Sequence, residues 1–201
     1  MNAGAEPIQD GRFAKGAATR AKLLDAAGEL LELHGYAGTG LNEIIARSGA
    51  PKGSLYHHFP GGKAELVAAA VTHVGRERAE EIEQVLEGCD STAEAARLIV
   101  DAFATRLEES NFQVGCPIAP VTLDCADPAV REACGGVYAD WTRLIAGRLK
   151  DDGLAPTAAD ELAELALVLI EGALVVSRAE RDRGPLDRVV GHLDRLLTPP
   201  R

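Results

Sequence analysis

Apolar residues recur at helical spacing along most of the chain, and this spacing constrains the fold more than any other sequence feature. After Thr19, for example, Leu23, Ala27, Leu30 and Leu31 follow the i, i+4, i+7, i+8 pattern of one helix face. No segment alternates apolar and polar residues as a half-buried strand does. Because Ala, Leu, Glu and Arg are frequent and favour helices, we expect an all-α fold.

The first third of the chain predicts three short helices. We expect residues 1–18 to be a flexible arm, because they lack apolar periodicity. A helix should begin with Thr19 as its N-cap and end at Gly35, and a second should run from Leu41 to Gly49. Pro51 suits the first turn of a third helix, which Pro60, Gly61 and Gly62 end. Residues 19–63 therefore form a three-helix unit that contains a helix-turn-helix.

The third helix, near residues 52–59, is too short to be stable alone. We expect Leu55 and Phe59, which are four residues apart, to pack against the first two helices. This packing leaves Lys52, Ser54, Tyr56 and His57 off the buried face.

Residues 64–201 predict a second, larger helical domain. A capping box at residues 91–94 and the step Asp127-Pro128 each begin a helix. A later helix is apolar almost all round from Leu162 to Val176 and should be buried on two sides. The last helix carries a clean apolar stripe from Leu186 to Leu197.

Charge is distributed unevenly between these two parts. The net charge is −10, yet residues 1–63 hold 7 Lys and Arg against 6 Asp and Glu. Residues 64–201 hold 14 against 25. An acidic total does not exclude DNA binding, because a phosphate backbone responds to charges within a Debye length of about 8–10 Å.

Several classes of protein receive no support. No apolar run reaches the length of about 18 residues that suggests a membrane span, and the N-terminus lacks an apolar signal core, so we expect a cytoplasmic protein. We expect no metal site, because His57 and His58 are helix neighbours that point about 100° apart. The four cysteines contain no CxxC pair and read as reduced thiols. No catalytic motif is present, so we expect neither an enzyme nor a cofactor.

The segment TRAKLLDAAGELLELHGY, followed by GLNEIIARSGAPKGSLYHHFPGGKAEL, resembles the DNA-binding domain of TetR-family transcriptional regulators. The later GCPIAP resembles the LmrA/YxaF-like subgroup. The chain departs from the family pattern at Gly40, where a Thr or Ser is usual, at Ile45, where a small Ala is usual, and in one extra glycine before Lys63. The resemblance implies a nine-helix, Ω-shaped homodimer with a variable ligand-binding core.

The recognition helix should enter the major groove of DNA with its N-terminus first. Lys52 and Ser54 are then placed for base edges, and Gly53 allows close approach. Tyr56 resembles the family tyrosine that reaches a phosphate, and Lys63 adds a charge at the next helix start. The full set of expected DNA-binding residues is Thr39, Lys52, Gly53, Ser54, Tyr56, His57 and Lys63. Taken singly, Lys52 and Lys63 also fit solvated helix ends, Tyr56 fits a packing residue, and His58 is assigned to packing.

The ligand-binding core is less defined by sequence. Its candidate residues are Phe103, Cys116, Cys134, Tyr138, Trp141 and Glu171. The aromatic and cysteine residues fit a core as well as a cavity, and a sensing thiol lacks an adjacent basic residue. Glu171 stands on an apolar helix, where pairing with an arginine, a ligand contact and a solvated dimer seam all stay open.

The family resemblance places the dimer interface on the last two helices. The expected interface residues are Leu169, Ala173, Val176, Leu186, Val189, Val190 and Leu193. We therefore expect a homodimeric repressor that binds double-stranded DNA at a palindromic operator and is released by a small organic effector. An activator or a regulator without a ligand is the alternative within the class. A helical small-molecule-binding protein or enzyme, whose N-terminal unit makes protein contacts only, is the alternative outside it.

Overall fold

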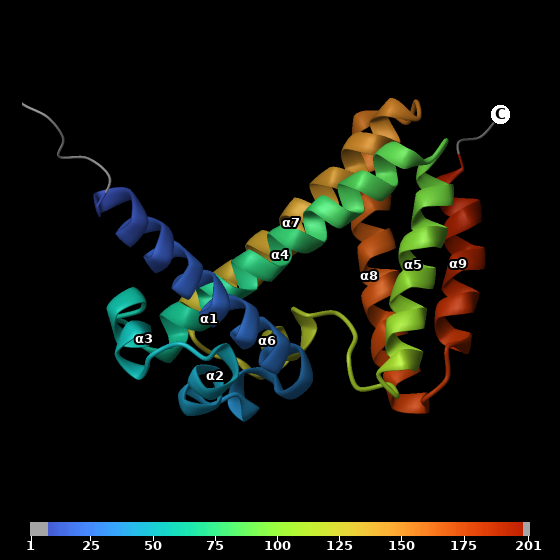
Figure 1. The fold of residues 1–201 in the computed structure, drawn as a ribbon. Coiled ribbons are helices and arrows are strands. Elements are labelled where there is room, and N and C mark those ends of the chain that lie inside the picture. The colour runs from blue at the N-terminus through green and yellow to red at the C-terminus, as the bar shows by residue number, and fades with distance from the viewer. Residues whose placement is uncertain (1–7, 199–201) are drawn as a thin grey trace, which may run out of the picture.

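The computed structural model describes residues 8–198, with side chains from residue 14 onward. This part of the chain contains helices and no strand (Figure 1). The helices are α1 (Ile8–Gly38), α2 (Leu41–Ser48), α3 (Lys52–His58), α4 (Lys63–Gly88), α5 (Thr92–Glu109), α6 (Ala119–Asp124), α7 (Pro128–Asp151), α8 (Pro156–Glu180) and α9 (Gly184–Leu197). The predicted all-α fold is confirmed.

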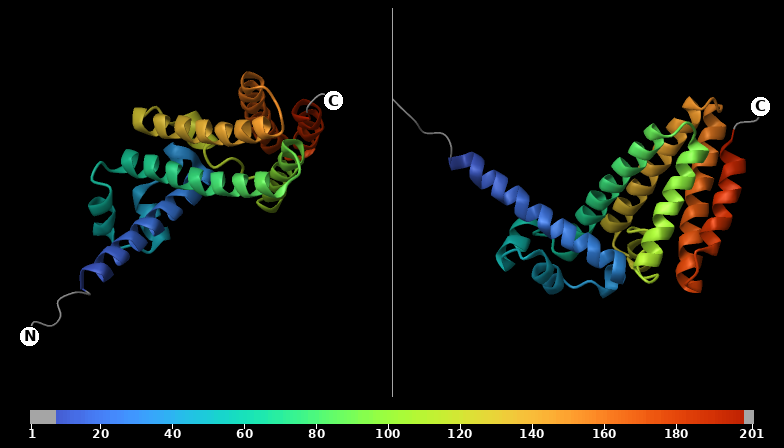
Figure 2. Two further views of the ribbon diagram at one scale, coloured as in Figure 1. Left: turned by 90° about the horizontal axis from the view of Figure 1, so that it is seen from above. Right: turned by 45° about the vertical axis from the view of Figure 1, so that its right-hand side comes forward.

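The helices form two groups, which the two long helices α4 and α7 connect. Helices α4 and α7 run side by side, α1 packs on the N-terminal half of α4, and α2 and α3 pack on α1 (Figures 1 and 2). Helices α5, α8 and α9 stand together at the other end of α4. Helix α1 therefore contacts both α4 and the predicted recognition helix, α3.

The seam between α4 and α7 is closely packed. Gly75 of α4 lies so near α7 that a Cβ atom on it would be 2.3 Å from a methyl carbon of Val137. The buried indole N–H of Trp141 donates to the Gly75 carbonyl oxygen at 2.9 Å. Trp141 is therefore a structural residue of this seam, and its only polar atom is already bonded.

The predicted start of the first helix is wrong. Helix α1 begins at Ile8, so residues 8–18 of the expected arm are helical, while residues 1–7 lie outside the described residues. Thr19 is not an N-cap, because its hydroxyl donates to the Lys15 carbonyl oxygen at 2.9 Å inside the helix. Alanines around this position favour helix and outweigh the capping signal of a single threonine.

The predicted stop at Gly35 is confirmed as a break within α1. Gly35 has φ 67° and ψ −171°, a conformation that is essentially restricted to glycine. After the break, the backbone N–H groups of Tyr36 and Ala37 donate to the two carboxylate oxygens of Asp124 at 3.0 and 2.9 Å. Asp124 is the last residue of α6, so this break ties the three-helix unit to the larger domain.

No helix among residues 8–198 is both long enough and apolar enough to cross a bilayer.

Candidate DNA-binding surface and effector cavities

Helix α3 is held by the two residues that the sequence assigned to packing. Leu55 and Phe59 are 0% and 1% exposed, respectively. The preceding turn has Gly49 in the left-handed conformation, which ends α2, and Pro51 at the N-cap of α3. These local signals therefore fix which face of α3 remains accessible.

The accessible face of α3 carries most of the predicted DNA-binding residues. Lys52, Gly53 and His57 are exposed, Tyr56 is 53% exposed, and Ser54 is half-buried. A cation, a hydroxyl, a phenol and an imidazole thus share one short helix, and this combination can contact both phosphates and base edges. Their roles in DNA binding stay predictions.

Thr39 does not fit the surface that was predicted for it. Its side chain is 1% exposed, and its hydroxyl donates to the Gly35 carbonyl oxygen at 2.7 Å. The break at Gly35 leaves that carbonyl without its helical partner, and the Thr39 hydroxyl satisfies it. We therefore correct the assignment of Thr39 from DNA contact to support of the turn before α2.

Two further predicted side chains lie near the ends of this surface. Lys63 begins α4, and its Nζ lies 4.3 Å from the centre of the Tyr36 ring. His58 is half-buried, and its ring meets Phe59 edge-on with centroids 6.4 Å apart. His58 therefore packs, as the sequence predicted.

Three cavities in the larger domain share one lining residue, Glu171. The outer cavity, of about 880 Å³, lies between α7 and α8 beside Tyr138 and Val168. The inner cavity, of about 40 Å³, lies among α4, α5, α7 and α8, and its lining includes Phe103 and Trp141. The loop cavity, of about 220 Å³, lies between α8 and the segment that contains Cys116. A carboxylate at this junction can contact a ligand in the outer cavity, whose volume suits a small molecule.

Glu171 also lies close to two other predicted ligand-binding residues. The Cys116 Sγ lies 3.9 Å from the Tyr138 hydroxyl oxygen. Burial raises the pKa of Glu171 to about 7, and a hydrogen bond with Cys116 opposes this shift. Burial also raises the pKa of the Cys116 thiol and that of the Tyr138 hydroxyl, so both stay protonated. The group is therefore a set of neutral donors beside a carboxyl that titrates near neutrality.

We expect Glu171→Gln to remove a pH-dependent loss of stability. The neutral carboxyl contributes stability that is fully present below its unfolded pKa of 4.5 and is lost as pH rises through about 7. Between about pH 5 and about pH 8.5, wild type should lose about 1–2 kcal/mol of unfolding free energy relative to Glu171→Gln, allowing for partial exposure. Urea denaturation at both pH values measures this difference.

Glu164→Gln is the matched control, because Glu164 is an exposed glutamate two turns earlier on α8. A difference between wild type and Glu171→Gln that does not change with pH would show that Glu171 titrates alike in both states.

Cys134 does not join the group around Glu171. It is buried on α7 and lies outside the lining of the three cavities. Burial raises the pKa of its thiol, and the side chain of Thr122 opposes the shift. Cys134 is therefore placed as a small apolar core residue, which was the alternative reading of its sequence.

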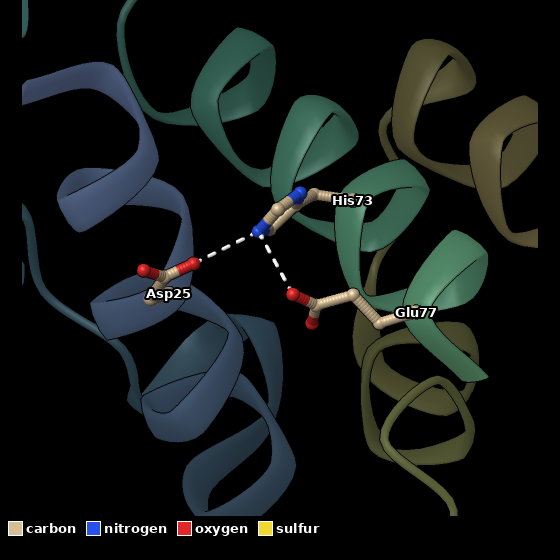
Figure 3. A group of neighbouring side chains, drawn as sticks. All are labelled: Asp25, His73 and Glu77. Carbon is tan, nitrogen blue, oxygen red and sulfur yellow. Dashed lines mark hydrogen bonds and ion pairs between the residues drawn. The ribbon is translucent and has the colours of Figure 1, made fainter. Parts of the chain in front are cut away.

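A histidine link between α1 and α4 was missed by sequence reasoning. The Nε2 atom of His73 lies 2.8 Å from an Asp25 carboxylate oxygen and 3.5 Å from a Glu77 oxygen (Figure 3). The three atoms that could coordinate a metal ion, one from each side chain, lie within 4.8 Å of one another, but both carboxylates are exposed. Of this group, the sequence shows only the i, i+4 spacing of His73 and Glu77, because Asp25 lies 48 residues from His73.

The predicted dimer interface is partly corrected. Ala173, Leu186 and Leu193 are buried within the protomer, where α9 packs on α5 and α8, so they are not available to a partner. Leu169, Val189 and Val190 are half-buried, and Val176 is 43% exposed.

Helix α8 packs against α7 and against α9 within the protomer, as its apolar sequence predicted, and it also keeps an exposed apolar face. Its outward face carries the apolar residues Leu165, Leu169 and Val176, separated by four and seven residues and therefore on one stripe. Leu165 is 42% exposed, and Leu196 of α9 is 40% exposed. An apolar face of this kind on two neighbouring helices is typical of a protein–protein interface.

Both the N-terminal and the C-terminal parts of the chain match models of known protein families. Residues 23–70 match the family model described as bacterial regulatory proteins, tetR family. Residues 92–192 match the model of the C-terminal domain of LmrA/YxaF-like transcriptional regulators.

Curated relatives align over most of their length. The uncharacterised HTH-type transcriptional regulator YxaF of Bacillus subtilis (strain 168) is 35% identical over 84% of this chain and 89% of its own. The HTH-type transcriptional regulator LmrA of the same organism is 33% identical over 89% and 96%. A solved TetR transcriptional regulator from Chloroflexus aurantiacus is 28% identical, with a TM-score of 0.73, and covers 90% of this chain and 95% of its own.

Proposed function

The chain belongs to the TetR family of transcriptional regulators, and from this premise we propose that it is a repressor released from a palindromic operator by a small organic effector. It is a DNA-binding transcriptional regulator, and the family's members are not enzymes. Family members bind DNA, form dimers and bind small-molecule effectors. Residues 19–63 would read DNA, and residues 64–201 would hold the effector and the partner protomer.

The exposed face of α3 is the observation that carries this proposal. Leu55 and Phe59 are buried and hold the helix in place. Lys52, Tyr56 and His57 lie on its exposed face. Two such helices in a dimer would read two half-sites about one helical turn of DNA apart. The palindrome follows from the two-fold symmetry of the dimer.

Release would follow from the position of the effector cavities. The inner cavity is lined by residues of α4, and α4 also packs on α1 of the DNA-binding unit. A ligand that favours one position of α4 would change the spacing of the two recognition helices. Operator affinity would then fall by a coupling free energy that is typically about 1–3 kcal/mol.

We expect Tyr56→Phe combined with Lys63→Ala to weaken binding to all duplexes alike. Both side chains are assigned to phosphates, and hydrogen bonds to charged groups contribute about 1.5–3 kcal/mol, so the loss should be about tenfold or more. Removing one positive charge should reduce the salt slope by about one. Fluorescence anisotropy on DNA from upstream of the gene and on a scrambled duplex, at several salt concentrations, measures both effects.

Lys150→Ala is the control for the lysine substitution, because Lys150 pairs with Asp160 at the far end of α7. It should leave both duplex affinities unchanged. A loss confined to one base position in the variant would contradict the phosphate assignment. Wild-type protein that binds neither duplex would contradict the proposed function itself.

A further inference from the structure

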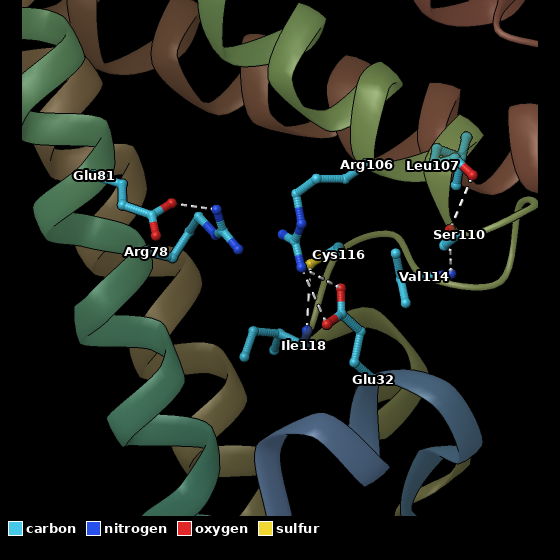
Figure 4. Close-up of polar contacts among 9 residues, drawn as sticks. All are labelled: Glu32, Arg78, Glu81, Arg106, Leu107, Ser110, Val114, Cys116 and Ile118. Atoms are coloured by element: carbon cyan, nitrogen blue, oxygen red, sulfur yellow. Dashed lines mark hydrogen bonds and ion pairs between the residues drawn. The ribbon is translucent and has the colours of Figure 1, made fainter. Parts of the chain in front are cut away.

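Two arginines from different helices line one narrow cleft. Arg78 of α4 and Arg106 of α5 border a cleft of about 70 Å³, and Figure 4 shows both side chains extending into the space between the two helices, near Glu32 of α1. Their side chains are 18% and 35% exposed, so both guanidinium groups are largely removed from water. Two cations rarely share such a place without anions that offset the cost of burial.

The carboxylates near these arginines satisfy only part of their hydrogen-bonding capacity. Arg78 pairs through Nη1 with Glu81, and Arg106 donates from Nη2 to the two carboxylate oxygens of Glu32 at 3.2 and 3.3 Å. Arg78 Nε and Arg106 Nη1 are fully buried and have no hydrogen-bond partner among the described residues. A buried donor left in this state costs about 1–3 kcal/mol, and more when it is charged.

Burial disfavours the charged forms of both Arg78 and Glu32, and the two arginines also repel each other. Burial lowers the pKa of Arg78, and the positive charge of Arg106 lowers it further. Burial raises the pKa of Glu32, although Arg106 and Arg78 oppose the shift. The Glu81 side chain is 60% exposed and pairs with Arg78 from the solvent side.

The walls of the cleft are apolar and continue into the inner cavity. Ile82, Ile99 and Phe103 line both spaces. The guanidinium carbon of Arg78 lies 5.5 Å from the centre of the Phe103 ring. A ligand with an anionic head at the arginines could therefore extend an apolar body along Phe103 towards Trp141.

We propose that the cleft between α4 and α5 binds the carboxylate of an amphipathic acid, with its head between Arg78 and Arg106 and its apolar body against Phe103. Planar guanidinium groups recognise carboxylates through paired N–H donors, and the two buried N–H groups supply one donor from each helix. An amphipathic carboxylic acid would then be the effector, an inference that rests on the proposed function.

The same site offers a route to the DNA-binding unit. Glu32 lies on α1, and its bond to Arg106 connects α1 to α5 across 74 residues of sequence. An incoming carboxylate at Arg106 Nη1 would lie beside the Glu32 carboxylate, which Arg106 holds through Nη2, and the two like charges would repel each other. Occupancy would loosen the connection of α1 to α5.

Isothermal titration calorimetry of the full-length protein with octanoate tests this site, with octan-1-ol as the uncharged probe of similar shape. We expect octanoate to bind once per chain and octan-1-ol to bind about tenfold more weakly or worse, because charged hydrogen bonds are lost. Arg78→Gln and Arg106→Gln should each weaken octanoate by about tenfold, and Arg106→Lys should lose less than Arg106→Gln. Glu32→Gln should strengthen octanoate binding, because it removes a like charge beside the bound carboxylate.

Equal binding of octanoate and octan-1-ol, or octanoate binding that is unchanged in both glutamine variants, would overturn the proposal. So would weaker octanoate binding in Glu32→Gln. Thermal unfolding of each variant shows whether it is folded. If Arg106→Gln does not fold, the octanoate affinity of Arg106→Lys tests the role of Arg106 instead. Calorimetry without DNA tests this site alone, whereas duplex binding by wild type without octanoate tests the proposed function alone.

Discussion

Glutamate at Leu165 and Val176 is expected to convert the protein to monomers and to weaken operator binding by about a hundredfold or more. Each side chain is more than 40% exposed in the protomer, and both lie on the outward stripe of α8. In a dimer that covers this stripe, two carboxylates per protomer would be buried without partners, at a cost of several kcal/mol. A monomer holds one recognition helix and would lose the contacts of a second half-site.

Sedimentation velocity measures the oligomeric state, and a gel shift with upstream DNA measures operator binding. Leu123→Glu serves as the control, because Leu123 is an exposed leucine on α6 that lines the loop cavity and does not belong to the outward stripe of α8. Leu193→Glu should instead unfold the protein, since Leu193 is 1% exposed inside the protomer. An intact dimer in the double glutamate variant would place the interface on another surface.

The recognition helix could be predicted from sequence because its determinants are local. Gly49 and Pro51 fix the turn, and the spacing of Leu55 and Phe59 fixes the buried face. Thr39 was misassigned because its role depends on the carbonyl that Gly35 exposes, which is a property of the folded backbone.

The dimer face shows a different limit of sequence reasoning. The apolar stripe of α9 was correctly found, but a stripe does not say whether its own chain or a partner covers it. Leu186 and Leu193 at the centre of the stripe face α5 and α8 of the same protomer. The exposed residues of α8 became apparent only when the protomer core was known.

Contacts between segments that lie far apart in the chain could not be predicted from the sequence. Arg106 and Glu32 belong to different predicted domains, and neither has a nearby residue that suggests the pair. The cluster around Glu171 was half predicted, since Cys116 and Tyr138 were named as candidates without any reason to meet. Helical periodicity gives the face of each helix, but not which faces meet.

Gly35→Ala is expected to lower the free energy of unfolding by about 2–6 kcal/mol. Its backbone has φ 67° and ψ −171°, and a side chain in this region costs about 1–3 kcal/mol. An added Cβ would also lie 2.7 Å from an Asp124 carboxylate oxygen. Asp124 would then have to leave the N–H groups of Tyr36 and Ala37, at about 0.5–1.5 kcal/mol for each hydrogen bond.

Urea denaturation measures this loss, with Gly147→Ala as the matched control on α7. An added Cβ at Gly147 meets nothing within 4 Å, so this helical substitution should be neutral or stabilising by about 0.5–1 kcal/mol. Asp124→Ala in the Gly35→Ala background separates strain from the lost contact. If the two losses overlap, the double variant will be less destabilised than their sum, because both act on the same junction between α1 and α6. Full additivity would show that Gly35 acts through backbone conformation alone, and an unchanged stability in Gly35→Ala would contradict the break itself.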